Sequence, residues 1–231
     1  MKKSNKLLLG GFLTGLLFIT AMHVTLYAKY KAGNYTVYNA DNDLASQLTQ
    51  TFPNILFVSV RNVPSATVKF GDVAGMKKDE EAGIMYVQRG DTLLITGTDS
   101  TTNHAFGHPV ALNLPYNATL SVFNSFLSFK PGKKTAESNL IIYMQKSHAL
   151  FSGHENQLRF GHLKVIASDN STAKFRGNTQ VSNLEVQLSG SSIDYTDGNF
   201  GQLFIATDSL SRISLPSKHL LRATIKTISP K

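Results

Sequence analysis

Four aspartates in the second half of the chain are the residues best suited to chemistry: Asp169, Asp194, Asp197 and Asp208. Paired carboxylates are what glycoside-cleaving enzymes use to protonate a leaving group and to activate a nucleophile. All four stand among Ser, Asn and Gly residues, where a short acidic side chain commonly hydrogen-bonds its own backbone in a turn. We therefore expect these aspartates to form turns. A polysaccharide lyase or hydrolase is the alternative, with Asp169 as its first candidate.

The histidines suggest a metal site less strongly than their number implies. His104 and His108 stand four residues apart, but this spacing brings two imidazoles together only on a helix, and the sequence between them is typical of a loop. A site also needs three or four ligands. His148, His154 and His162 fall near the ends of successive repeats, where we expect exposed edge residues. The sequence predicts neither a metal nor another cofactor.

Two further motifs have simple structural interpretations. Arg89-Gly90-Asp91 spells a cell-attachment tripeptide, but it lies between two short apolar runs, where a tight turn requires glycine. Lys130, Lys133 and Lys134 surround Pro131-Gly132 and form the densest basic cluster of the domain. Such a cluster could face anionic headgroups or glycans, although a solubilising loop is the simpler interpretation. Phosphate-binding glycine loops, nucleophile elbows and redox motifs are absent from the sequence.

Composition removes several classes of protein. The chain has no cysteine, which excludes disulfides, thiolate metal sites, a cysteine nucleophile and a lipid-modified cysteine. The formal charge of +8 is unevenly distributed, because 18 basic residues face 15 acidic residues after residue 31. A domain so close to neutral lacks the positive surface that binds a phosphate backbone, so no nucleic-acid partner is expected. The five basic residues of the N-terminal segment are Lys2, Lys3, Lys6, Lys29 and Lys31.

The N-terminal segment predicts a membrane anchor. Residues 7–28 run for about 22 positions without a charge, which is long enough for one helical crossing of a bilayer. A cleaved signal peptide is the alternative, but its apolar stretch is shorter, and Leu26 breaks the small-x-small pattern before Ala28. We expect a cytoplasmic tail over residues 1–6 and a single-pass protein of the bacterial inner membrane with its C-terminal domain in the periplasm. Export after signal cleavage remains the alternative.

The exported part predicts an all-β domain over residues 55–228, after a linker or short capping helix over residues 29–54. Apolar and polar residues alternate in short runs, as at Leu56, Val58 and Val60, and a period of two indicates half-buried strands. A Leu-x-apolar strand start recurs at intervals of 20, 23, 21, 19 and 18 residues. The six starts are Leu120, Leu140, Leu163, Leu184, Leu203 and Leu221.

A period near 20 residues indicates coils that stack along one axis. Alternate residues of each strand would then form inward columns of aliphatic side chains, while Ser, Thr, Asn and Lys point outward. We predict a parallel β-helix, right-handed as parallel crossovers generally are. An antiparallel β-sandwich is the alternative, although its turns recur every 8–12 residues or so, and Asp197-Gly198 is one of few hairpin signals in the sequence.

Several stretches resemble the GIN domain, a family described as an auto-transporter adhesin head and found mainly in Bacteroidota. The similar region covers residues 55–228, and its motifs are Phe57-Val58-Ser59-Val60, residues 66–72, residues 90–95 and residues 184–192. The resemblance implies a β-helical domain at the cell surface or envelope. This chain differs by carrying an apolar helix in place of a lipid-modified cysteine.

The sequence thus favours a membrane-anchored, non-enzymatic β-helix that acts as a scaffold or adhesin-like binding module of the cell envelope. An envelope protein or a glycan is the expected partner, besides the membrane itself. The oligomeric state is left open by the sequence. The alternative function is that of a carbohydrate-active enzyme that uses the corner aspartates.

Overall fold

The computed structural model describes residues 3–31, 50–77, 83–97, 110–132 and 136–229. The chain divides into two units, residues 1–40 and residues 41–231. The first contains the helix α1 (Lys3–Lys31), whose segment Gly10–Lys29 has a mean hydropathy of 1.5 and is not buried against protein. One apolar helix of this length could be a membrane anchor or a signal sequence.

Polar side chains within α1 bond to the helix itself. The hydroxyls of Thr14, Thr20 and Thr25 each donate to the carbonyl four residues earlier, over 2.7–2.9 Å. His23 Nδ1 lies 2.8 Å from the carbonyl oxygen of Ile19. Because hydrocarbon offers no hydrogen-bond partners, these internal contacts are what a membrane-spanning helix requires of its polar residues.

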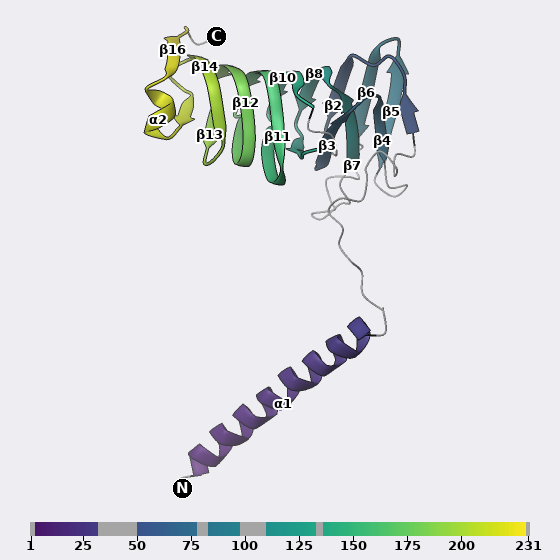
Figure 1. Ribbon diagram of the computed structural model, residues 1–231, viewed down its shortest axis with the longest axis vertical. Coiled ribbons are helices and arrows are strands. Elements are labelled where there is room, and N and C mark those ends of the chain that lie inside the picture. The colour runs from purple at the N-terminus through teal and green to yellow at the C-terminus, as the bar shows by residue number, and fades with distance from the viewer. Residues whose placement is uncertain (1–2, 32–49, 78–82, 98–109, 133–135, 230–231) are drawn as a thin grey trace. The chain divides into compact units, whose positions relative to one another are not determined.

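The second unit is a β-solenoid of about five turns. Its coils alternate between two sheet surfaces, which we call face A and face B, and Figure 1 shows successive coils side by side. In spatial order, face A contains β5 (Ile84–Arg89), β6 (Thr92–Gly97), β2 (Phe57–Arg61), β8 (Asn117–Phe123), β10 (Ser138–Gln145), the second parts of β11 (His148–Ser168) and β12 (Thr172–Ser189), β14 (Asn199–Thr207) and β16 (Ala223–Thr227).

Face B contains, in spatial order, β1 (Gln50–Phe52), β4 (Ala74–Lys77), β7 (Val110–Pro115), β3 (Ala66–Gly71), β9 (Phe126–Phe129), the first parts of β11 and β12, β13 (Ser192–Tyr195) and β15 (Arg212–Ser214). The one-turn helix α2 (Ser217–Leu220) follows β15 and leads into β16. From β8 onward every described pairing between neighbouring coils is parallel. The predicted β-helix is therefore confirmed and the antiparallel sandwich is not favoured, while the hand of winding stays a prediction.

The first coil is out of chain order. Strands β2 and β3 pair with β8 and β9 on one side and with β6 and β7 on the other. The coil of β6 and β7 is therefore the outer one, although it follows β2 and β3 in the sequence. The chain then crosses to the other side of β2 and β3 to form β8 and β9. Antiparallel strands close this end: β5 against β6, β4 against β7, and β1 against β4. β1 lies at the end of the segment predicted as a linker, and the capping helix predicted there lies outside the described residues.

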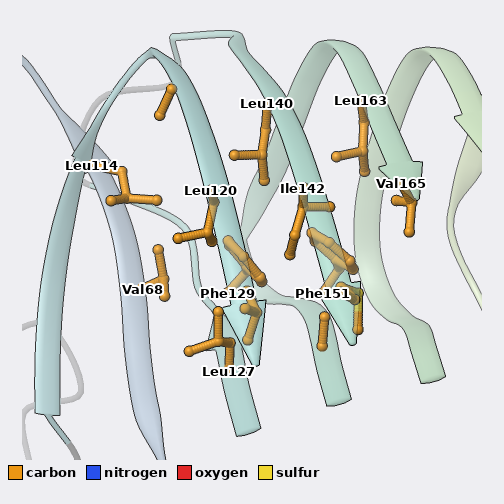
Figure 2. Packing of buried hydrophobic residues seen from close by; sticks show 14 of the residues in the cluster. Val68, Leu114, Leu120, Leu127, Phe129, Leu140, Ile142, Phe151, Leu163 and Val165 are labelled. Carbon is orange, nitrogen blue, oxygen red and sulfur yellow. The ribbon is translucent and has the colours of Figure 1, made fainter. Parts of the chain in front are cut away.

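Inward side chains stack in columns along the solenoid axis. Leu140, Leu163, Leu184 and Leu203 occupy one register position of face A and are buried. On face B the rings of Phe129, Phe151 and Phe175 stack with centroids 4.5 and 4.7 Å apart, and Figure 2 shows the first two among the aliphatic side chains. These columns are the hydrophobic core of the domain.

Two of the six predicted strand starts are displaced by two residues. Leu120 pairs with Ile142, and Ala118 occupies the position opposite Leu140. At the other end Ala223 pairs with Leu203, whereas Leu221 is 88% exposed. The Leu-x-apolar pattern cannot fix register by itself, because each strand carries several inward positions two residues apart.

A column of serines forms the corner where each coil passes from face A to face B. Ser147 Oγ donates to the carbonyl of Gln145 at 2.7 Å and accepts the N–H of Ser125 at 3.3 Å, so it links two coils. The residues Ser125, Ser171 and Ser191 repeat this arrangement. Ser211 also accepts the N–H of the preceding ladder serine, Ser191, but donates to Asp208 Oδ1 instead of to a carbonyl. We call these five residues the serine ladder. The residue before a ladder serine often has positive φ, as at Asn124, Lys146, Asn170 and Gly190.

Candidate functional site

Asp169 lies at the serine-ladder corner and has a structural role there. Its backbone has φ 54°, a left-handed conformation that Asp and Asn adopt more readily than most residues. Its Oδ2 accepts a 2.6 Å hydrogen bond from Gln145 Nε2 of the preceding coil. The carboxylate therefore orients a neighbouring amide, and the residue suits the left-handed backbone of the turn.

In the last corner of the serine ladder, the Asp208 carboxylate takes the place of the backbone carbonyl as the acceptor for the ladder serine. It is 4% exposed, and it accepts hydrogen bonds from Ser211 Oγ at 2.6 Å, Gly190 N at 3.0 Å and Leu210 N at 3.2 Å. These bonds, that from Ser211 above all, lower the pKa of the Asp208 carboxyl, although burial opposes them. A carboxylate held ionised by two donors from its own corner and one from the corner of the preceding coil is a structural group.

The other two candidate aspartates lie elsewhere on the coils. Asp194 projects from β13 on face B, where the register places it beside Lys174 and Ser214. Asp197 lies in the turn after β13 and its Oδ1 accepts the N–H of Gly198 at 2.9 Å. The four aspartates thus occupy two different corners and one strand face. The solenoid does not assemble them into one carboxylate cluster.

The remaining candidates from the sequence are the histidines, the basic cluster around Pro131-Gly132 and the Arg89-Gly90-Asp91 motif. Among the described residues, no group of three His, Asp or Glu side chains could hold a metal ion. His148 lies at the start of β11 on face B and His162 on its face A part, whereas His104, His108, the side chain of His154, Lys133 and Lys134 lie outside the described residues. Gly90 has φ +60° between the antiparallel strands β5 and β6, so the predicted turn at Arg89-Gly90-Asp91 is confirmed.

The outward surface of face A carries aromatic residues that the sequence pattern alone did not single out. Phe57 on β2, Tyr143 on β10 and Phe204 on β14 are 45%, 46% and 46% exposed. They are outward residues of strands whose inward positions already form the core, so the fold does not need them to be aromatic. The alternation that predicted the strands also marked these positions as outward, and large apolar residues there were the available signal.

Face A is hollowed next to Tyr143. The hollow has a volume of about 360 Å³ and extends over β2, β8, β10 and β11. Its outward lining side chains form two rows across these strands. The first row contains Arg61, Phe123, Gln145 and Ser168, and the second contains Ser121, Tyr143 and Ile166. The outward lining is mixed: Phe123, Tyr143 and Ile166 supply apolar surface, and the other four side chains are polar. A ligand site combines apolar contact area with such polar groups.

Arg61 gives this hollow its charge. Among the described residues that line the hollow it is the one ionised side chain, it is exposed, and it forms no ion pair within the described part of the chain. The hollow therefore presents one unneutralised guanidinium beside the aromatic ring of Phe123, which is opposite Arg61 in the strand register.

A second hollow of about 370 Å³ lies further along face A, over β12, β14 and β16. It is lined by Glu185, Gln187, Phe204, Thr224 and Lys226, among others. Between the two hollows, Lys164 Nζ and Glu185 Oε1 form an ion pair of 2.6 Å across neighbouring coils. The outward surface of face A therefore mixes exposed aromatic residues with charged ones.

The fold and this surface define a parallel β-solenoid with one N-terminal apolar helix and a partly aromatic outer face. Comparison with protein-family descriptions, with curated proteins and with solved structures finds no match to this chain.

Proposed function

We propose that this protein is a non-enzymatic binding scaffold of the bacterial cell envelope, tethered to the inner membrane by α1, with its solenoid in the periplasm. Face A is its binding surface, and an envelope protein or glycan is its partner. The observation that carries the proposal is the half-exposed set Phe57, Tyr143 and Phe204 on one outward sheet surface. Phe57 and Phe204 lie in one row, on either side of the Lys164–Glu185 ion pair. Exposed aromatic side chains on a rigid scaffold are typical of interaction sites.

Two properties of the chain support this proposal over catalysis. The four aspartates are dispersed, and Asp208 accepts three hydrogen bonds from its own corner and the neighbouring one. A rigid stack of coils also presents outward side chains at fixed spacing of about 4.8 Å per coil, which suits recognition of an extended partner.

The tether is tested by extraction of membranes with alkaline carbonate, followed by the intact mass of the recovered chain. We expect the full-length chain to stay in the membrane fraction with its N-terminal segment present, because α1 is long enough to span the bilayer. A soluble chain that lacks the residues up to about Ala28 would show that the segment is a cleaved signal.

The binding surface is tested by sedimentation of the detergent-solubilised full-length chain with envelope fragments from cells that lack it. Wild type should sediment saturably with the fragments, and the triple variant Phe57→Ser, Tyr143→Ser, Phe204→Ser should stay in solution. The matched control is Phe126→Ser with Leu150→Ser, which removes apolar side chains from face B. Equal sedimentation of all three proteins would contradict the proposal.

A further inference from the structure

The geometry points to the hollow beside Tyr143 as a binding site for an acidic glycan, with one sugar ring on the aromatic side chains and its carboxylate on Arg61. This inference rests on the proposed function, which it makes specific by naming the class of ligand. The site is small: a volume of about 360 Å³ lies near the lower end of the roughly 300–1,000 Å³ typical of small-ligand sites.

The charge of the hollow selects an anion. Arg61 is exposed and unpaired among the described residues, and its planar guanidinium can donate two parallel hydrogen bonds to a carboxylate. The neighbouring outward positions in the same row are Phe123 and Gln145, which carry no charge. The lining itself contains Arg61 and no carboxylate, while the Asp169 carboxylate borders the hollow and is hydrogen-bonded to Gln145 Nε2.

The aromatic side chains select a flat, partly apolar ligand. Tyr143 is nearly half exposed, and Phe123 lies one strand away in the adjacent row. The C–H face of a sugar ring packs on such rings, while its hydroxyls reach the polar groups around them. Tyr and Phe supply this contact area at a small entropic cost, because each has two side-chain torsions.

Gln145 is held in position to accept a hydrogen bond. Its Nε2 donates to Asp169 Oδ2 at 2.6 Å, which fixes the orientation of the amide and leaves Oε1 to accept from a ligand hydroxyl. Ser121 and Ser168 supply further hydroxyls in the lining. In this arrangement Asp169 is a positioning residue that acts through Gln145.

A glycan fits this surface better than a protein does. The fully buried centres of protein interfaces are depleted of charged residues, whereas the Lys164–Glu185 ion pair stands on face A between the two hollows with side chains 30% and 43% exposed. A polysaccharide can contact a hollow on either side of such a pair, because its own surface is polar.

The test is isothermal titration of the full-length chain in detergent micelles with short oligogalacturonates, oligomannuronates and hyaluronan fragments, each beside its methyl ester. The esters keep the sugar rings and lose the charge. We expect at least one acid to bind, and its ester to bind about tenfold more weakly or worse, because a charged hydrogen bond is lost. Equal binding of acid and ester, or binding of none of the acids, overturns the inference.

Variants assign the contacts. Arg61→Gln and Tyr143→Ala should each weaken binding of the acid by about tenfold or more, and Arg61→Lys should be intermediate because it keeps the charge but not the bidentate geometry. The matched control is Arg212→Gln, which removes an exposed positive charge from face B. An equal loss with Arg212→Gln would mean non-specific attraction and overturn the assignment.

The role of Asp169 has its own pair of variants. Asp169→Gly and Asp169→Asn both remove the carboxylate charge, but Asp169→Gly also removes the acceptor for Gln145, so it should bind the acid more weakly than Asp169→Asn does. Asp169→Asn keeps an acceptor oxygen and should restore binding.

If no acid binds while the chain still sediments with envelope fragments through face A, the glycan inference fails and the proposed function stands. Loss of both kinds of binding would remove both.

Discussion

Asp208 illustrates how the environment of a single residue separates a structural carboxylate from a catalytic one. Its three hydrogen-bond donors belong to residues 190, 210 and 211, and they lower its pKa below the ordinary value of 3.8. The folded chain therefore releases this proton more readily than the unfolded chain. Its ionised form stabilises the fold above about pH 3.8, and this stabilisation is lost as the pH falls through the folded-state pKa.

We expect Asp208→Asn to lower the melting temperature at pH 7 and to reduce the further loss of stability between pH 4 and lower pH, because the amide cannot supply an ionised acceptor to the same donors. Thermal unfolding followed by circular dichroism across this pH range measures both effects. Asp169→Asn is the control, since asparagine suits its left-handed backbone. An unchanged melting temperature for Asp208→Asn would contradict the structural role of this carboxylate.

Ser171 tests the serine ladder. Its hydroxyl accepts the N–H of buried Ser147 at 3.2 Å and donates to the carbonyl of Ser168 at 2.6 Å. Ser171→Ala leaves that buried N–H without its partner, so we expect a loss of about 1–3 kcal/mol in the free energy of unfolding. Urea denaturation measures it, with exposed Ser121→Ala as the control. Equal stabilities of the two variants would mean that the ladder contributes little.

At the scale of the elements, the register of neighbouring coils can be tested by crosslinking, because the chain has no cysteine of its own. Lys164 on β11 is opposite Glu185 on β12. The double variant Lys164→Cys, Glu185→Cys should form an intramolecular crosslink rapidly with a short bifunctional maleimide, as seen by mass spectrometry of digests. The control pair, Lys164→Cys with Lys174→Cys, places the thiols on different faces and should not. The reverse result would contradict the parallel stacking.

The C-terminal element α2 covers the end of the aromatic column. His219 is buried against Tyr195 and Phe200, with ring centroids 4.9 and 5.4 Å away, and neither His219 Nε2 nor the Tyr195 hydroxyl has a hydrogen-bond partner among the described residues. Burial lowers the pKa of His219, and the charges of Lys218 and Arg222 add to this effect. Burial, with the charge of Asp197, raises the pKa of Tyr195 to about 12.

We therefore expect a fall in pH to destabilise the C-terminal end of the solenoid. Above pH 6.5, the ordinary histidine value, His219 is neutral in both the folded and unfolded chain. As the pH falls below that, the unfolded chain is protonated first, so the folded end loses stability. Hydrogen exchange of residues 217–227 should become faster relative to β10 between pH 7 and pH 5, and His219→Phe should abolish the difference. A pH-independent ratio in wild type would contradict this.

The elements differ in how far the sequence could specify them. Alternation and the 20-residue period were sufficient for the β-solenoid, because inward positions such as Leu163 and Leu184 must be apolar in every coil. The out-of-order first coil could not be predicted, since β6 and β7 carry the same alternation as β2 and β3, and only pairing distinguishes their positions. The hollow on face A depends on the register between four strands. The sequence pattern placed Leu120 opposite Leu140, two residues from its true partner Ile142, and this error alone would have brought the wrong residues together.

The whole molecule combines an apolar helix with a solenoid whose face A carries exposed aromatic side chains and, in the hollow beside Tyr143, a guanidinium with no ion-pair partner among the described residues. The sequence predicted the helix and the class of domain, because each follows from local patterns of hydrophobicity. It offered the corner aspartates as the candidate site, whereas the structure assigns Asp208 to its corner and Asp169 to the orientation of Gln145.

Whether face A is occupied by a partner outside the cytoplasm can be measured by labelling single cysteines with a membrane-impermeant maleimide. Ser121→Cys lies on face A and His148→Cys on face B, and both parent residues are exposed. We predict that both label in the purified chain, but that in intact cells only His148→Cys labels readily. Equal labelling of the two in cells would contradict a bound face A, and labelling of neither would contradict the periplasmic location.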